Sequence, residues 1–159
     1  LLEKTVRENT SLASLKENSH SGFIDFSWEK REAISYIDKL RIKTPSDSAI
    51  IKNLSGGNQQ KVVIAKWLLA KSKILIMDEP TRGIDVNAKA EIYELMKNFV
   101  EEGGSIILVS SELPEVLGCS NRIMVMREGY VTGFLDSAEA TEENVMLFAS
   151  KGNEEVVYE

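Results

Sequence analysis

A pair of glycines at the start of an apolar helix constrains this chain more than any other feature. Residues 54–62 read LSGGNQQKV, and a strongly apolar segment continues to Leu69. Ser55 is predicted to be the N-cap, because its hydroxyl oxygen can accept from an amide of the first turn. Glycines admit a ligand close to the backbone, and a helix N-terminus carries unpaired N–H groups with partial positive charge. The pattern indicates an anion site, typically for phosphate, or simply a glycine turn before a buried helix.

A second motif downstream favours the anion site over the simple turn. Residues 74–77, ILIM, are typical of a fully buried strand, and Asp78-Glu79-Pro80 follow directly. Open α/β sheets place their chemistry beyond the carboxyl ends of the strands. Asp78 and Glu79 are therefore predicted to belong to the site, with a capped turn before Pro80 as the alternative reading.

The two motifs together resemble those of a known family. LSGGNQQKV, here called the signature segment, followed by ILIMDEPTRGID, is similar to the ATP-binding subunit of an ABC transporter. The segments DEPTRGIDV and VSSELPEV resemble the second ATP-binding half of bacterial monosaccharide importers of the ribose, galactose and xylose type. The resemblance implies an α/β fold: a P-loop NTPase-like ABC ATPase fragment, with a helical subdomain followed by the C-terminal part of a mainly parallel sheet with flanking helices.

This resemblance also implies how the chain is divided. We expect a helical signature subdomain over 1–72, the C-terminal part of a RecA-like ATPase core over 73–150 and a loose acidic tail over 151–159. No G-x-x-x-x-G-K-[ST] loop occurs in the sequence, so we expect a fragment that lacks the N-terminal part of the domain. A sheet without its neighbouring strands exposes an edge and an apolar face, and the isolated chain is therefore expected to self-associate.

Hydrophobic periodicity and turn residues predict the other elements. A helix with Ser27 as N-cap and a longer helix with a glycine cap are expected, followed by a second buried strand that completes a right-handed parallel βαβ unit. A short helix capped by Ser110 or Ser111, a hairpin and a final helix come next. The predicted ranges are 28–40 and 85–100 for the first two helices, 106–109 for the strand, 110–117 for the segment that opens the short helix, 122–126 and 130–135 for the hairpin, and 141–149 for the last helix.

Composition excludes several classes of function. The net charge of −6 and the pI near 5.0 argue against a general nucleic-acid binder. Cys119 is the only cysteine, so an internal disulfide is impossible. No apolar run is long enough to span a bilayer, and membrane association would have to come through a partner subunit. The single histidine, His20, lies in a predicted loop over residues 19–22 and is interpreted as a solvated residue rather than a ligand.

The resemblance implies ATP and Mg²⁺ as cofactors and assigns roles to the site residues. Asp78 is suited to hold Mg²⁺, which prefers hard oxygen ligands, and Glu79 is suited to orient or deprotonate the attacking water. The signature segment would contact the γ-phosphate of an ATP molecule held mainly by the opposite domain. Its contacting residues are expected to be Ser55, Gly56, Gly57 and Asn58, with help from Gln59. Asn58 stands where the family more commonly has glutamine.

Two further positions carry open alternatives. Asp85, in a loop that resembles the one crossing the family's dimer interface, could also be the N-cap of the next helix, and both roles can hold together. Ser111 stands where the common pattern has a histidine that contacts the γ-phosphate, and a serine lacks the charge and proton behaviour of histidine. Either this site hydrolyses ATP slowly, or Glu79 works with help from another group.

The implied function is that of an energising subunit of an ABC-type sugar importer, peripheral on the cytoplasmic face of the inner membrane. Its expected partners are a membrane-spanning permease subunit, a second ATP-binding domain across the ATP sandwich and, indirectly, a periplasmic sugar-binding protein. The isolated fragment is expected to be inactive. The alternatives are a soluble ABC-type ATPase of DNA repair or translation, which would need a basic face, and a catalytically degenerate nucleotide-binding or interaction module.

Overall fold

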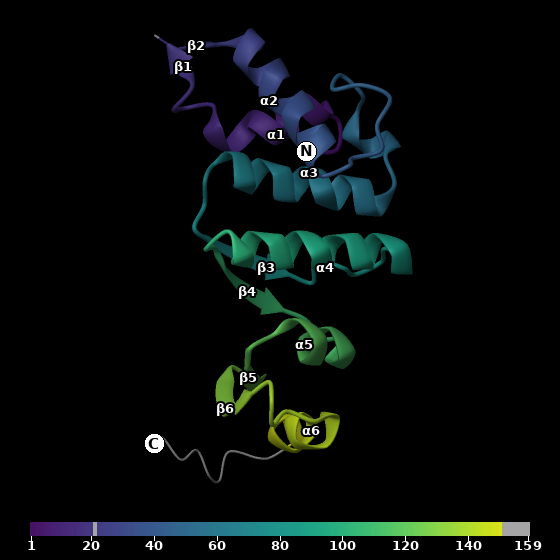
Figure 1. The fold of residues 1–159 in the computed structure, drawn as a ribbon, viewed down its shortest axis with the longest axis vertical. Helices are drawn as coiled ribbons and strands as arrows, with labels where there is room; N and C mark the ends of the chain where they lie inside the picture. The colour runs from purple at the N-terminus through teal and green to yellow at the C-terminus, as the bar shows by residue number, and fades with distance from the viewer. Residues whose placement is uncertain (21, 151–159) are drawn as a thin grey trace. The chain divides into compact units, whose positions relative to one another are not determined.

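In the computed structural model, which describes residues 1–20 and 22–150, the chain forms two compact units of helices and short strands (Figure 1). The first unit runs from Leu1 to Ile107 and the second begins at Leu108. The fold class is α/β, as predicted. The boundary expected at residue 72 remains a prediction, and the expected acidic tail lies outside the described residues.

The first unit opens with a helix that the sequence analysis missed. Helix α1 spans Val6–Ser11 and continues into a 3-10 turn, η1, over Leu12–Ser14. Thr5 and Glu8 form a capping box, in which Thr5 Oγ1 accepts from the Glu8 amide at 3.1 Å and Glu8 Oε2 accepts from the Thr5 amide at 2.8 Å. The bond from the Thr5 backbone, with the contacts of Lys4, lowers the pKa of Glu8 to about 2. The spacing Thr-x-x-Glu was the available sequence signal for this helix.

A short hairpin and a second helix follow, with two corrections to the predictions. Strands β1 (Ser19–His20) and β2 (Phe23–Ile24) pair antiparallel, with Ser19 opposite Ile24 and His20 opposite Phe23, so the loop predicted at 19–22 is corrected to a strand at its first two residues. Helix α2 spans Phe26–Lys39, and its N-cap is Asp25 rather than Ser27. Asp25 Oδ1 accepts from the amides of Ser27 and Trp28 at 2.9 and 3.0 Å, since a carboxylate is the stronger acceptor for these unpaired donors.

The predicted strand–helix–strand arrangement follows, and its last strand runs two residues past the end of the first unit at Ile107. The 3-10 turn η2 (Ile51–Asn53) leads into α3 (Gly56–Leu69), followed by β3 (Ile74–Asp78), α4 (Val86–Glu101) and β4 (Ser105–Val109). Strands β3 and β4 pair with each other, and the Ser105 amide donates to the Lys73 carbonyl at 2.9 Å. This bond joins the two strand beginnings, so the strands run in the same direction.

The predicted glycine cap at the end of α4 is confirmed. Gly103 has a φ of +93°, which side-chain-bearing residues rarely adopt. Its amide donates to the Val100 carbonyl at 2.9 Å, and the Gly104 amide donates to the Phe99 carbonyl at 3.0 Å. These two bonds are those of a Schellman motif.

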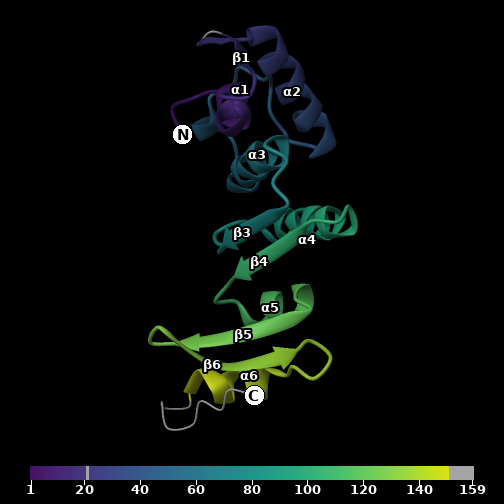
Figure 2. The ribbon, with the colours of Figure 1, turned by 90° about the vertical axis from the view of Figure 1, so that its left-hand side faces the viewer.

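One face of the β3–β4 sheet is apolar and exposed, which contradicts the prediction of fully buried strands. Leu75 and Met77 of β3 are buried, together with Ile92 and Met96 of α4, whereas Ile76 is 73% exposed. The side chains of a strand alternate between two faces, and α3 and α4 pack on only one of them. Figure 2 shows α4 beside these strands. Self-association through the exposed face remains a prediction.

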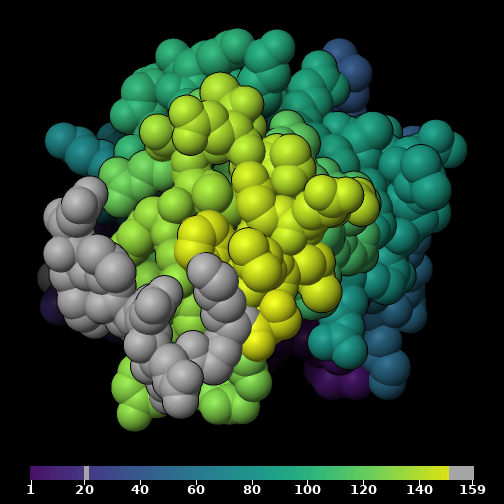
Figure 3. All heavy atoms as spheres, turned by 90° about the horizontal axis from the view of Figure 1, so that it is seen from below, coloured from purple at the N-terminus to yellow at the C-terminus, as the bar shows by residue number. Residues whose placement is uncertain are grey.

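The second unit packs a hairpin against its last helix. It comprises α5 (Leu113–Cys119), β5 (Arg122–Arg127), β6 (Tyr130–Asp136) and α6 (Glu142–Ser150). The predicted hairpin is confirmed, with an antiparallel register and a two-residue Glu128-Gly129 loop at positive φ. Helix α6 lies against β5 and β6 (Figure 2). In the space-filling view of Figure 3, α6 is yellow. The core of this unit contains Ile123, Val125 and Val145.

The prediction of a serine cap for α5 is wrong. Glu112 occupies the N-cap position and makes no side-chain capping bond. Ser110 Oγ accepts from the Glu112 amide at 3.0 Å, so this serine stabilises the turn before the helix instead.

Candidate functional site

The signature segment forms the beginning of α3, and its serine is an N-cap by backbone only. Ser55 has φ −62° and ψ 155°, and α3 starts at Gly56 as predicted. Its hydroxyl makes no capping bond, however, because Ser55 Oγ accepts from the side-chain Nδ2 of Asn58 at 2.8 Å. Gln59 is also engaged, since its Nε2 donates to the Leu54 carbonyl at 2.9 Å. The expected capping by the Ser55 side chain is therefore corrected.

The two glycines of this segment have different surroundings. Gly57 is buried, and a Cβ added there would lie 2.6 Å from the Cβ of Ala88 in α4. Gly56 is exposed, and its added Cβ would lie 3.4 Å from Cγ2 of Ile84, an ordinary contact. Gly57 is thus required for the close approach of α3 and α4. Gly56 leaves backbone accessible at the surface, where a ligand could approach.

Alanine substitutions should separate these two roles. Gly57→Ala is expected to lower the free energy of unfolding of the first unit by about 1–3 kcal/mol, because overpacking forces α3 away from α4. Gly56→Ala should leave stability within about 1 kcal/mol, since its Cβ fits and alanine favours the helix. Both tryptophans, Trp28 and Trp67, lie in the first unit, so urea titration followed by fluorescence measures the change. Adding Ala88→Gly to Gly57→Ala should restore stability; an unchanged loss would mean that this contact is not the cause.

The packing of Gly57 on Ala88 brings the beginning of α4 beside the signature segment. Asp85 is the N-cap of α4, and its Oδ1 accepts from the Ala88 amide at 3.0 Å. This confirms one of its two predicted roles, while the interface role stays a prediction. Two helix N-termini therefore lie side by side, each with partial positive charge. The Asp85 carboxylate caps one amide of α4, whereas no side chain caps α3, so the N-terminus of α3 is the one suited to an anion.

The two predicted acidic residues lie at the carboxyl end of β3 in the same unit. Asp78 is the last residue of the strand and is exposed, and Glu79 is half-buried. Glu79 has a φ of +46°, a conformation that costs a non-glycine residue about 1 kcal/mol. The Arg82 amide donates to the Glu79 carbonyl at 3.2 Å and closes the turn that follows.

Backbone strain at Glu79 differs from the other cases in the described ranges. Arg41 and Lys71 also have positive φ, but each directly follows the cap of a helix, where this conformation is common. Glu128 occupies the hairpin loop, whose turn type requires positive φ. Glu79 follows a strand, without a helix end or hairpin to explain it. Unexplained strain of this kind supports a functional hypothesis for the residue.

The predicted site residues therefore fall into three places. Ser55 to Gln59 and the loop ending at Asp85 are brought together at the N-termini of α3 and α4. Asp78 and Glu79 lie at the end of β3, and the turn that follows Glu79 leads into that loop. Ser111 is exposed in the second unit, two residues before α5.

An ion pair between a buried lysine of the signature segment and a half-exposed glutamate of α4 was missed by the sequence analysis. The Lys61 side chain is 3% exposed, and its Nζ lies 2.6 Å from Oε2 of Glu91 and donates to the Arg41 carbonyl at 3.1 Å. The hydrogen bond from Lys61 lowers the pKa of Glu91. A lysine inside an apolar helix was the only sequence signal, and it did not identify a partner thirty residues away (61 to 91).

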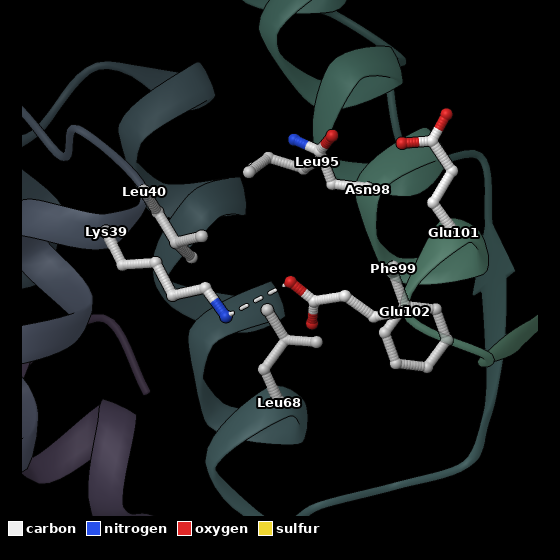
Figure 4. A pocket seen from close by; sticks show the side chains of 8 residues that line it. All are labelled: Lys39, Leu40, Leu68, Leu95, Asn98, Phe99, Glu101 and Glu102. Carbon is white, nitrogen blue, oxygen red and sulfur yellow. Dashed lines mark ion pairs between the residues drawn. The ribbon is translucent and has the colours of Figure 1, made fainter.

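A cavity of about 250 Å³ in the first unit lies away from these residues (Figure 4). Leucine and phenylalanine side chains line it together with polar and charged ones, and the Lys39–Glu102 ion pair at 3.8 Å spans the polar part. Its lining residues are Lys39, Leu40, Leu68, Leu95, Asn98, Phe99, Glu101 and Glu102. Because Leu68 is twelve residues beyond Gly56 on α3, the cavity is about 18 Å along the helix from the signature segment. It is therefore separate from the candidate site.

Sequence comparisons place the chain in the family suggested by its motifs. The profile of the family described as ABC transporter matches residues 1–82, about half of the chain. The chain belongs to the ABC transporter family. It is 52% identical to the ribose import ATP-binding protein of Oceanobacillus iheyensis and 51% identical to the xylose import ATP-binding protein of Moorella thermoacetica. Each match covers 96% of this chain but 31% and 30% of those proteins, so the chain spans about three tenths of the length of these curated relatives.

Solved structures support the same fold. A metal-chelate type ABC transporter in an inward-facing conformation superposes with a TM-score of 0.79 at 16% identity, over 92% of this chain and 58% of that one. An ATP-binding cassette solved as a post-hydrolysis dimer with ADP and Pi gives a TM-score of 0.71 at 23% identity, over 86% and 58% of the two chains. At these identities the likeness concerns the fold. The predicted ABC ATPase type of fold is confirmed.

Proposed function

We propose that this chain is part of the ATP-binding subunit of an ABC-type sugar importer, and that its signature segment completes an ATP site held mainly by another domain. The proposal rests on one observation: the N-termini of α3 and α4 are adjacent. Gly56, at the start of α3, is exposed and lies next to Ile84. This arrangement offers unpaired amides and positive partial charge to a phosphate group. The names of the relatives, ribose and xylose import ATP-binding proteins, favour a sugar as cargo of the assembled transporter.

The acidic end of β3 is suited to the chemistry of ATP hydrolysis. Asp78 is exposed and offers hard carboxylate oxygens, which fits a magnesium ion that takes one carboxylate and its remaining ligands from phosphate and water. Magnesium bound there would neutralise phosphate charge. Glu79 would orient or deprotonate the attacking water. Its positive φ sets the direction in which the side chain leaves the backbone. Ser111 would occupy the position of the family's histidine, and turnover at this site is expected to be slow or assisted by another group.

The proposed partners follow from the same assignment. A second ATP-binding domain would contribute the remainder of the ATP sandwich, a permease subunit would span the membrane, and a periplasmic sugar-binding protein would deliver the cargo. We propose that the subunit is peripheral on the cytoplasmic face of the inner membrane. Among residues 1–20 and 22–150, no helix has the length and apolar character needed to cross a bilayer.

Calorimetric titration of Mg-ATP tests the proposal. We expect no binding heat with this chain alone, and binding once an ABC domain that carries its own P-loop is added. The expected difference arises because the signature segment contacts only the γ-phosphate, while the P-loop holds most of the nucleotide. Tight binding by the chain alone would contradict the half-site assignment. Absence of any effect of this chain on binding by the P-loop domain would contradict the proposed function itself.

A further inference from the structure

Ser55 does not use its side chain as an N-cap serine usually does. Such a serine normally accepts from the backbone amide of the second or third helical residue. Here Ser55 Oγ accepts from the side-chain Nδ2 of Asn58, the third helical residue, at 2.8 Å. A hydroxyl has two acceptor lone pairs and one hydrogen, so this contact uses a lone pair and leaves the hydrogen for another acceptor. Because Ser55 is exposed, that acceptor can be a ligand.

The amide group of Asn58 is held at both of its polar atoms. Its Oδ1 accepts from the backbone N–H of Lys43 at 2.8 Å, while its Nδ2 donates to Ser55. These partners define the orientation of the amide, because exchanging its oxygen and nitrogen would place an NH₂ group against the N–H of Lys43. Asn58 therefore uses both ends of its amide inside the protein.

The segment that contains Lys43 is itself anchored to α3. Lys61 is one turn after Asn58 and donates to the carbonyl of Arg41 at 3.1 Å, while it pairs with Glu91 of α4 at 2.6 Å. Two side chains of α3 thus hold the backbone that follows α2. Through Asn58, the orientation of the Ser55 hydroxyl depends on this held segment.

We propose that Asn58 is a positioning residue that acts on ATP through the Ser55 hydroxyl, which it orients toward a phosphate oxygen. The inference rests on the proposed function, and it assigns Asn58 a different role from the direct phosphate contact that the family resemblance implies.

The Asn58→Asp variant is the first test, with Mg-ATP titrated into the chain mixed with a P-loop-bearing ABC domain. Aspartate has the shape of asparagine and can still accept from the Lys43 amide, but it cannot donate to Ser55. The hydroxyl hydrogen of Ser55 would turn inward to the new acceptor. Affinity is expected to fall at least about tenfold, because one hydrogen bond to a charged group is lost and the new carboxylate repels the phosphate. The double-mutant cycle below, which adds no charge, separates these two effects. Hydrogen exchange at the Lys43 amide should stay as slow as in the wild type.

A double-mutant cycle separates positioning from direct contact. Ser55→Ala and Asn58→Ala should each weaken binding about tenfold, and the double variant should be no weaker than Ser55→Ala, because Asn58 acts through that hydroxyl. Val63→Ala is the control on α3 just outside the signature segment and should change affinity less than about twofold, because Val63 is exposed and surface substitutions have small effects.

Three results would overturn the inference. Wild-type affinity in Asn58→Asp would show that donation to Ser55 is not needed. Multiplicative losses in the cycle would show that Asn58 acts on the nucleotide independently of Ser55. Absence of binding in the wild-type mixture would remove both this inference and the proposed function, and that result is visible before any variant is made.

Discussion

Replacing Glu79 by glutamine is expected to lower the kcat of ATP hydrolysis by about 10²–10⁴-fold, the usual contribution of a general base. The assay uses the full-length subunit, of which this chain is a part, assembled with its permease. Glutamine keeps the size and the hydrogen-bonding oxygen of glutamate but cannot take a proton from water. Affinity for Mg-ATP should change by less than about threefold, because the lost interaction is made mainly in the transition state. Phosphate release and nucleotide titration measure the two quantities.

The matched control for this substitution is Glu128→Gln. Glu128 is also a glutamate at positive φ, with 51° against 46° for Glu79, but it lies in the hairpin loop of the second unit. Its replacement should leave kcat unchanged. If Glu79→Gln hydrolysed ATP at the wild-type rate, Glu79 would not be the base, and slow hydrolysis at this site would be the better account.

A third variant distinguishes strain from chemistry. Glu79→Gly removes both the carboxylate and the cost of holding a side-chain-bearing residue at positive φ, so it should stabilise the first unit by about 1 kcal/mol. The same variant should be as inactive as Glu79→Gln. A gain in stability with a loss of hydrolysis is expected where a strained residue is kept for its function.

The motifs of the candidate site are local in sequence, and the positions of the helices and strands that carry them could therefore be predicted. The start of α3 at Gly56 and the N-cap role of Asp85 follow from short-range patterns of glycine and aspartate. The strand before Asp78 was also predicted, because apolar runs and turn residues indicate element types directly. The apolar pattern could not predict which strand residues are buried. Ile76 was expected in the core but is exposed, because α3 and α4 cover only one face of the sheet.

The contacts that arrange the candidate site connect distant segments, and this is why they were not predicted. Gly57 looked like a residue kept small for a ligand, yet the atom it approaches is the Cβ of Ala88. The side chain of Asn58 bonds to Lys43, fifteen residues earlier, and Lys61 pairs with Glu91. Such partners depend on how helices pack against each other rather than on local spacing.

The wrong predictions of the N-caps, at Asp25 and Glu112, had a different cause. Several polar residues in a row compete there for the same backbone amides.

The ion pair between Lys61 and Glu91 should show unequal costs when either partner is removed. Glu91→Gln leaves the buried ammonium group of Lys61 without a counter-charge, although the Arg41 carbonyl and the new amide oxygen can both accept from it. We expect a loss of about 2 kcal/mol in the free energy of unfolding, below the 3–5 kcal/mol typical of fully buried pairs because the Glu91 side chain is 45% exposed. Lys61→Met should cost less than about 1 kcal/mol, since methionine fills the apolar stem and Glu91 can be hydrated. Equal costs would mean that packing, rather than the buried charge, determines the effect.

The stabilisation from this pair should also depend on pH in a defined direction. The hydrogen bond from Lys61 holds the pKa of Glu91 below its ordinary value of 4.5. The ionised carboxylate therefore stabilises the folded state fully above pH 4.5, and this contribution is lost as the pH falls below that value. Glu8 has a lowered pKa as well, so the measurement is the difference in unfolding free energy between wild type and Glu91→Gln, by urea titration from pH 7 to about pH 3. The difference should shrink as Glu91 becomes protonated; a constant difference would show that the charge of Glu91 does not stabilise the packing of α3 on α4.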